Sequence, residues 1–144
     1  MTGGVSVYLL APLAAWLVAQ GGKYVLAMVK SRKLSHYRQL YISGGMPSAH
    51  SATTAALLAV VGLTDGVDGA LFGMAALFTA IVMYDAMMVR HASGTQGVAI
   101  HALIAERKSK VALPRVARGH TPLEVAVGAV LGVVVGVVVF FATK

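Results

Sequence analysis

The fold of this chain is decided by its most apolar stretch, PLEVAVGAVLGVVVGVVVFFA, which occupies residues 122–142. About 20 mainly apolar residues are enough for a helix to cross the hydrocarbon core of a bilayer. The whole chain shares this bias, since 58% of its 144 residues are hydrophobic, 12% are charged and the mean hydropathy is +0.78. Soluble domains are about a quarter charged. The composition therefore excludes a soluble domain and a disordered chain, and it predicts an integral membrane protein.

Three further stretches resemble membrane spans in length or apolarity. We predict an all-α integral membrane bundle of four transmembrane helices, a single membrane domain over residues 1–144, with spans at about 5–29, 48–63, 69–89 and 122–142. The second stretch is short and rich in Ala and Thr, so hydropathy supports it least. Glycines recur every four positions in the last span, at 128, 132 and 136. This spacing lets helices pack closely, either against another span or against a second copy in a homodimer.

The basic residues predict how these spans are oriented. They gather around the first and third connections, whereas the second connection has only Asp65 and Asp68. Because cytoplasmic loops retain Lys and Arg, we expect both termini outside the cell. The same arrangement places the net charge of +7 against lipid headgroups, and no nucleic-acid motif accompanies it. The third connection, about 90–120, predicts either a short interfacial helix with a basic end or a solvated basic loop.

Ionisable side chains inside a span are costly and are therefore candidates for function. Lys23 and Lys30 lie two helical turns apart on one face of the first span. The alternative for both is that the ammonium groups simply reach the headgroups. Asp85, at the end of the third span, needs a partner, and Lys23 and Arg90 are the candidates.

A glycine-rich turn precedes the second span, where residues 44–50 read GGMPSAH. Gly44 and Gly45 permit positive φ and close backbone approach, and Ser48 can cap the helix. A helix N-terminus attracts anions through its free N–H groups. As an abstract pattern this is only a helix start, but His50 one turn into a membrane helix favours a phosphate cradle.

The last span begins with Gly119-His120-Thr121-Pro122-Leu123-Glu124. Thr121 and Glu124 have the spacing of a capping box, with Pro122 at the first helical position. Capping explains these three residues but not His120. A carboxylate four residues away can orient the imidazole of a nucleophilic histidine. Together with the cations and His50, this arrangement favours phosphoryl transfer.

These segments, taken together, resemble the type 2 phosphatidic acid phosphatase superfamily, which includes bacterial acid phosphatases and vanadium-dependent haloperoxidases. The order is Lys23-x6-Lys30, then Pro47-Ser48-Ala49-His50, then Arg90, then His120-x3-Glu124. The strings Gly-Gly-Met-Pro-Ser-x-His and Gly-His-x-Pro-x-Glu-Val are similar to its divergent bacterial branch of haloperoxidase-related membrane proteins. The resemblance implies a bacterial plasma membrane and a phosphatase that needs neither a metal ion nor a cofactor.

The resemblance also implies roles for individual residues. His120 would be the nucleophile, Glu124 would orient it, and His50 would protonate the leaving group. The phosphate-binding residues would be Lys23, Lys30, Ser48, Ala49 and Arg90, supported by Gly44, Gly45, Pro47 and Asp85.

The chain departs from the superfamily pattern in each motif. Lys30 stands in place of an arginine, Ala49 in place of a glycine and Glu124 in place of an aspartate. Residues 91–119 separate Arg90 from His120 where the superfamily has a short spacer. Arg115 and Arg118 are therefore alternatives to Arg90.

We expect an integral-membrane phosphatase that hydrolyses a lipid phosphate or pyrophosphate at the cytoplasmic leaflet through a phosphohistidine. Membrane lipids and the phosphorylated lipid substrate are its expected partners, and the sequence does not choose among phosphatidate, phosphatidylglycerophosphate and polyprenyl phosphates. The alternative is a non-catalytic protein that binds or transports anionic lipid headgroups. A divalent-metal site remains a third hypothesis, although the spacing matches no known zinc pattern; its candidate ligands are Asp85, His91, His101, His120 and Glu124.

Overall fold

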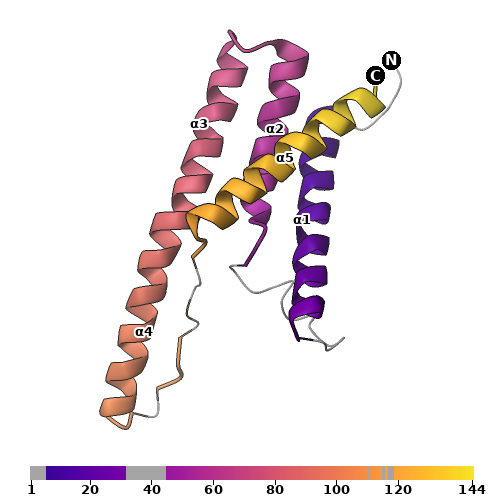
Figure 1. Ribbon diagram of the computed structural model, residues 1–144. Helices are drawn as coiled ribbons and strands as arrows, with labels where there is room; N and C mark the ends of the chain where they lie inside the picture. Colours follow the sequence, from indigo (N-terminus) through magenta and orange to yellow (C-terminus); the bar gives the residue numbers. More distant parts are fainter. Residues whose placement is uncertain (1–5, 32–44, 110, 115, 117–118) are drawn as a thin grey trace.

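The computed structural model describes residues 6–31, 45–109, 111–114, 116 and 119–144, of which Lys30 and Ser31 are described by their backbone alone. The elements in chain order are α1 (Val7–Ser31), α2 (Ala49–Asp65), α3 (Ala70–Tyr84), the π-helical turn η2 (Asp85–Val89), α4 (Arg90–Glu106) and α5 (Pro122–Ala142). Figure 1 shows their arrangement. The described residues contain no strand, so the predicted all-α class is confirmed.

Among the described residues, three helical segments are long and apolar enough to cross a membrane. They are Val7–Val29, Ala70–Glu106 and Pro122–Ala142. The second predicted span corresponds to α2, which has 17 residues and falls short of the roughly 20 that a span needs. It nevertheless packs among the other helices, and a fourth span stays a prediction.

The third predicted span does not end near residue 89. α3, η2 and α4 form one continuous helical rod of 37 residues, and no proline interrupts it. At 1.5 Å per residue the rod is about 55 Å long, well beyond the roughly 30 Å of the hydrocarbon core. α4 therefore projects past the other helices (Figure 1). The residues predicted to form a short interfacial helix are helical, as part of α4, and they continue the rod without a break. Their position at the membrane interface stays a prediction.

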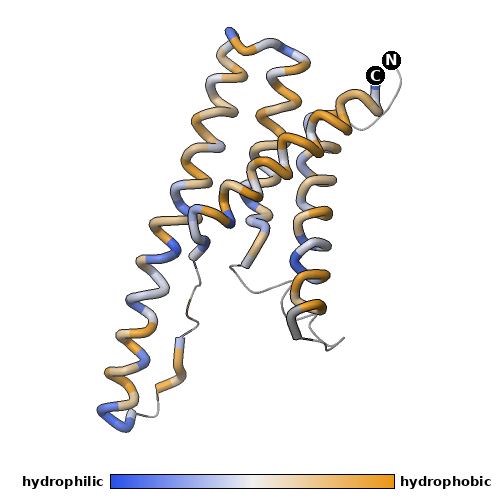
Figure 2. The backbone as a smooth tube through the Cα atoms, in the orientation of Figure 1, coloured by the Kyte–Doolittle hydropathy of each residue, from blue (hydrophilic) through white to orange (hydrophobic). Residues whose placement is uncertain are grey.

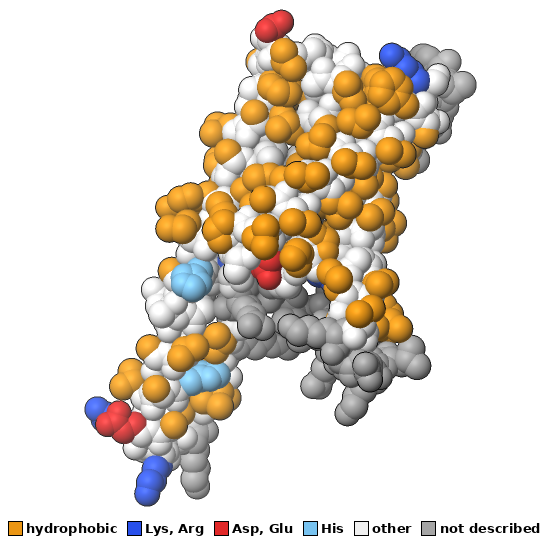
Figure 3. All heavy atoms as spheres, in the orientation of Figure 1, with side chains coloured by type: hydrophobic (Ala, Val, Ile, Leu, Met, Phe, Trp, Pro, Cys, Tyr) orange, Lys and Arg blue, Asp and Glu red, His pale blue; other side chains and the backbone are white. Residues whose placement is uncertain are grey.

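α2 lies at the centre of the bundle and packs against α1, α3 and α5, while α1 also contacts α5. The interior is built from small side chains, such as Ala15, Ala19 and Ala52, and its largest fully buried side chains are two valines and two serines. Large apolar side chains are exposed on the helix surfaces (Figure 3), and apolar residues run along most of each helix (Figure 2). Helices in lipid gain stability from close packing of small residues rather than from hiding large ones, so this distribution fits a membrane bundle.

The glycines of the last span pack against α2. A Cβ atom at Gly128 would meet the carbonyl oxygen of Ser48, and one at Gly132 would meet that of Ala52. Close packing of this face is therefore confirmed, and its partner is another helix of the same chain. The predicted homodimer stays a prediction.

Candidate functional site

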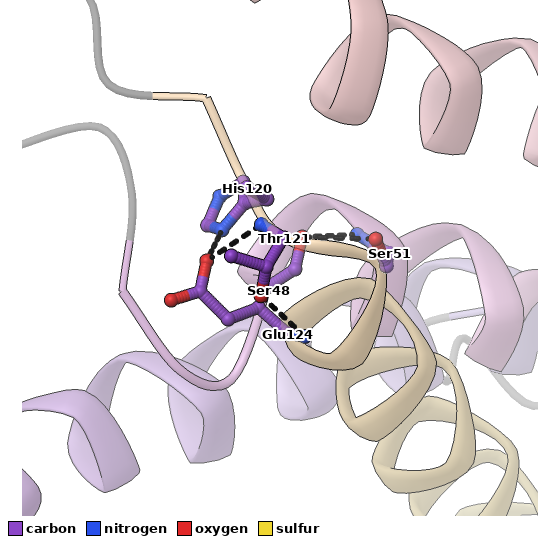
Figure 4. Close-up of polar contacts among 5 residues, drawn as sticks. All are labelled: Ser48, Ser51, His120, Thr121 and Glu124. Atoms are coloured by element: carbon purple, nitrogen blue, oxygen red, sulfur yellow. Dashed lines mark hydrogen bonds and ion pairs between the residues drawn. The ribbon is translucent and has the colours of Figure 1, made fainter. Parts of the chain in front are cut away.

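His120 lies directly before α5 and pairs with Glu124 in the first turn of that helix. The distance from His120 Nδ1 to Glu124 Oε2 is 3.0 Å. The same carboxylate oxygen accepts a hydrogen bond from the Thr121 N–H at 3.1 Å, and Thr121 Oγ1 accepts one from the Glu124 N–H at 3.3 Å (Figure 4). The predicted capping box is therefore confirmed. Glu124 caps α5 and contacts the imidazole with one oxygen atom.

The backbone before α5 is held against η2. The His120 N–H donates to the Ala86 carbonyl at 2.9 Å. A Cβ atom at Gly119 would lie 2.7 Å from the backbone nitrogen of His91 and 2.9 Å from its Cα. The chain thus returns from α4 to the point where α4 begins, which places His120 beside the end of the third span.

The start of α2 is joined to the start of α5 through Ser48. Its hydroxyl caps α2 by accepting from the Ser51 N–H at 3.4 Å, and it also accepts from Ser51 Oγ at 2.9 Å. Its own N–H donates to the Glu124 carbonyl at 3.1 Å. Ser48 is 0% exposed. The structure therefore places its hydroxyl inside the contact between the two helices, as a cap, rather than on an open surface.

The turn before α2 rests on α1. Gly45 has a φ of +86°, in the left-handed region where glycine is at ease. Pro47 is buried and lies 3.6 Å from where a Cβ at Gly22 would be. This contact puts the turn beside Lys23. Gly44 and the side chain of Lys30 lie outside the described residues.

Four segments bring ionisable groups within electrostatic reach of one another. Lys23 of α1 acts on Glu124, His50 and His120. Arg90 acts on both histidines. Lys23, Arg90 and Glu124 are half-buried, whereas His50 is exposed. Together with Asp85, which also acts on His50, the arrangement joins two cations, two imidazoles and two carboxylates at one end of the bundle.

Asp85 and Arg90 form an ion pair. Arg90 Nε lies 3.0 Å from Asp85 Oδ2, so Arg90 is a partner that the sequence proposed for Asp85. Arg115 and Arg118 lie outside the described residues.

Two further candidates from the sequence, Ala49 and His101, contribute no side chain to this cluster. Ala49, the first residue of α2, is buried. His101 lies out on α4, where its Nε2 is 2.6 Å from the Pro114 carbonyl oxygen. Within the described ranges, no three His, Asp or Glu side chains gather as a metal ion would require.

Burial lowers the pKa of the His120 imidazole below its usual value near 6.5, because a charged ring is poorly solvated there. The hydrogen bond with Glu124 acts in the opposite direction, while the charges of Lys23 and Arg90 reinforce the lowering. The net effect favours a neutral imidazole at neutral pH. A neutral ring is the form in which histidine can act as a nucleophile.

Two features of the site have no counterpart among the predictions. They are the hydrogen bond from His120 to Ala86 and the close approach of Gly119 to His91. Because glycine has no Cβ, Gly119 is itself a sequence signal for close backbone approach. A π-helical turn has no comparable signature in local sequence, so the role of Ala86 could not have been found that way.

Comparison of the sequence with known proteins identifies the family. A family model described as "Divergent PAP2 family" matches residues 5–135. The "Uncharacterized membrane protein YuiD" of Bacillus subtilis (strain 168) is 34% identical over 148 residues, which cover 92% of this chain and 93% of that protein. No solved structure matches the chain. The family match includes both histidine motifs, the first two apolar segments and the first two thirds of α5, and the chain therefore belongs to the divergent PAP2 family.

Proposed function

We propose that this membrane protein is a phosphatase that hydrolyses a lipid phosphate or pyrophosphate through a phosphohistidine on His120. The observation that carries the proposal is the 3.0 Å contact between His120 Nδ1 and Glu124 Oε2. A carboxylate at this position keeps the proton on Nδ1, so the lone pair of Nε2 is available to attack phosphorus. Thr121 fixes the same carboxylate through its N–H, which limits rotation of the pair.

The reaction then has two steps that use the two histidines. In the first step the Nε2–P bond forms, the bond from phosphorus to the leaving oxygen breaks, and His50 gives that oxygen a proton. In the second step water attacks phosphorus, the N–P bond breaks, and His50 takes the proton of the water. His50 is exposed at the start of α2, where a leaving group and water can reach it. General acid–base catalysis of this kind contributes about 10²- to 10⁴-fold.

Positive charge around His120 supports the transfer of an anionic group. Lys23 and Arg90 both act electrostatically on the imidazole, and Asp85 holds the guanidinium of Arg90 in place. The N-terminus of α2 adds its dipole and its first amides, those of Ala49 and His50. Such preorganised charge stabilises the oxygens of a phosphoryl group in the transition state.

A lipid substrate is supported by an apolar crevice along α2. The crevice has a volume of about 470 Å³ and is lined by apolar side chains of α1, α2 and α3, among them Leu57 and Phe78. Leu57 lies seven residues beyond His50, and Phe78 seven residues before Asp85, which is about 10 Å along each helix. An acyl chain attached to a phosphate at the site would reach the crevice at this depth.

A second candidate function is supported by the burial of His120, whose side chain is 2% exposed. In that case Lys23, Arg90 and His50 bind an anionic headgroup, and the pair of His120 and Glu124 only caps α5. Under the phosphatase proposal, substrate binding must open the site so that phosphorus can reach Nε2. The two functions therefore differ in whether a bound lipid phosphate is turned over.

Release of inorganic phosphate by the purified protein in lipid–detergent micelles tests the proposal. Phosphatidate, phosphatidylglycerophosphate and polyprenyl phosphates and pyrophosphates are assayed with EDTA present. We expect release by wild type, a loss of about 10²- to 10⁴-fold in Glu124→Gln, which no longer enforces the tautomer, and no release by His120→Ala. His101→Ala, a histidine change on α4, is the matched control and should keep wild-type activity. Binding of these lipids without release would support the second function instead.

A further inference from the structure

We propose that the π-helical turn η2 is the positioning element of the site: its wide turn frees the Ala86 carbonyl to hold the backbone of His120 and brings Asp85 onto Arg90. This inference rests on the proposed function for the meaning of the site, but the contacts themselves do not depend on catalysis. It explains how two residues separated by residues 91–119 in the chain come to act together.

The backbone of η2 departs from α-helical hydrogen bonding. The Arg90 N–H donates to the carbonyl of Asp85, five residues back, whereas in an α-helix it would donate to Ala86, four residues back. The Ala86 carbonyl is thereby released from Arg90, and it accepts the His120 N–H at 2.9 Å. The extra residue in the turn creates the acceptor that anchors the proposed nucleophile.

The side chains of Asp85 and Arg90, at the two ends of η2, meet because of the wider turn. Residues five apart on an α-helix point about 140° away from each other. In the wider turn Asp85 and Arg90 meet, with Arg90 Nε 3.0 Å from Asp85 Oδ2. The same local distortion therefore fixes both the backbone beside the nucleophile and the guanidinium proposed to bind phosphate.

The chain returns from α4 to the start of that helix at Gly119. Gly119 approaches His91 so closely that a Cβ would press on backbone nitrogen and Cα atoms, which cannot move aside as a flexible side chain could. The segment before His120 is thus seated directly on the residue that follows Arg90. Although α4 separates Arg90 from His120 in the sequence, the two residues stay close in space, because the chain leaves η2 through α4 and comes back to η2 at Gly119.

Two pairs of variants of the full-length protein in detergent micelles test this inference. Deletion of Met88 removes the extra residue, so the carbonyl of Ala86 would be taken by the N–H of His91, which becomes its i+4 donor. Deletion of Ala102 in α4 is the matched control. Gly119→Ala introduces the clash with His91, and Gly73→Ala is its control, because a Cβ at Gly73 has no neighbour within 4 Å.

Two readouts separate positioning from folding and from activity. The first is kcat and KM for phosphate release, for which a misplacement near 1 Å costs about 100-fold. The second is the ¹⁵N resonances of the histidine ring nitrogens, with the His120 signals identified by their absence in His120→Ala. We expect ΔMet88 and Gly119→Ala to lower kcat about 100-fold and to shift the His120 signals, while both controls resemble wild type. KM should stay nearly unchanged in Gly119→Ala but rise in ΔMet88, because this deletion also moves the guanidinium of Arg90.

The outcomes are distinct. Unchanged kcat and ring signals in both Gly119→Ala and ΔMet88 would overturn the inference, as would equal changes in the control variants. If ΔMet88 does not fold, Gly119→Ala against Gly73→Ala decides alone. If wild type releases no phosphate but the His120 signals shift in Gly119→Ala and not in Gly73→Ala, the proposed function fails while the positioning role of η2 stands.

Discussion

Glu124 combines two roles that looked like alternatives in the sequence. One carboxylate oxygen accepts from the Thr121 N–H and contacts His120 Nδ1. The capping box fixes the carboxylate, and the carboxylate in turn fixes the imidazole. Capping therefore does not compete with the proposed orientation of His120 but supplies its rigidity.

The pKa of His120 predicts how the protein responds to acid. The unfolded imidazole binds a proton near pH 6.5, whereas burial lowers the pKa of the folded one. Between these two values the unfolded state binds more protons, so stability falls as the pH falls through this window. We expect phosphate release to persist below pH 6.5 and thermal stability to decline on acidification more in wild type than in His120→Gln. Equal slopes in the two proteins, measured by thermal unfolding from pH 7.5 to pH 5, would contradict this.

Among the helices, α2 carries His50 and α5 follows His120, so the contact between α2 and α5 holds the two histidines near each other. Their backbones approach at Gly128, Gly132 and Gly136, and the Ser48 N–H donates to the Glu124 carbonyl at the same crossing. In lipid, such close approach of backbones is a main source of helix association. The three glycines on the face of α5 that packs against α2 therefore help to set the distance between His50 and His120.

Gly132→Ala should therefore destabilise the protein. The new Cβ would meet the backbone of Ala52, and overpacking of this kind costs about 1–3 kcal/mol. Gly73→Ala should be neutral or stabilising, because its Cβ has open space and Ala favours a helix over Gly by about 1 kcal/mol. Thermal unfolding in detergent measures both, and equal stability of the two variants would contradict the described packing.

At the scale of the whole molecule, the bundle has two different ends. The described turn between α2 and α3 lies at one end, and the tip of α4 and the site lie toward the other (Figure 1). Apolar side chains cover the helices between them, and charged residues gather at the tip of α4 (Figure 3). This polarity fits a protein whose site faces one leaflet.

Single cysteines test the predicted orientation, and the chain has no cysteine of its own to interfere. Thr64 lies near the end of α2, and Ser109 follows α4. We expect a membrane-impermeant thiol reagent to label Thr64→Cys in intact cells and Ser109→Cys only after the cells are opened. Labelling of both in intact cells would rule out a cytoplasmic site.

The membrane class, the helical fold, the starts of α2 and α5 and the family could all be predicted from the sequence, because apolarity, capping and motif order are properties of short stretches of chain. Its motifs also named the residues of the candidate site. Three features appear only in the folded molecule: α4 continues the third span, Ser48 is buried between α2 and α5, and the Ala86 carbonyl accepts from the His120 N–H. These depend on which backbone groups meet across the bundle, and neither hydropathy nor spacing encodes where a helix widens by one residue.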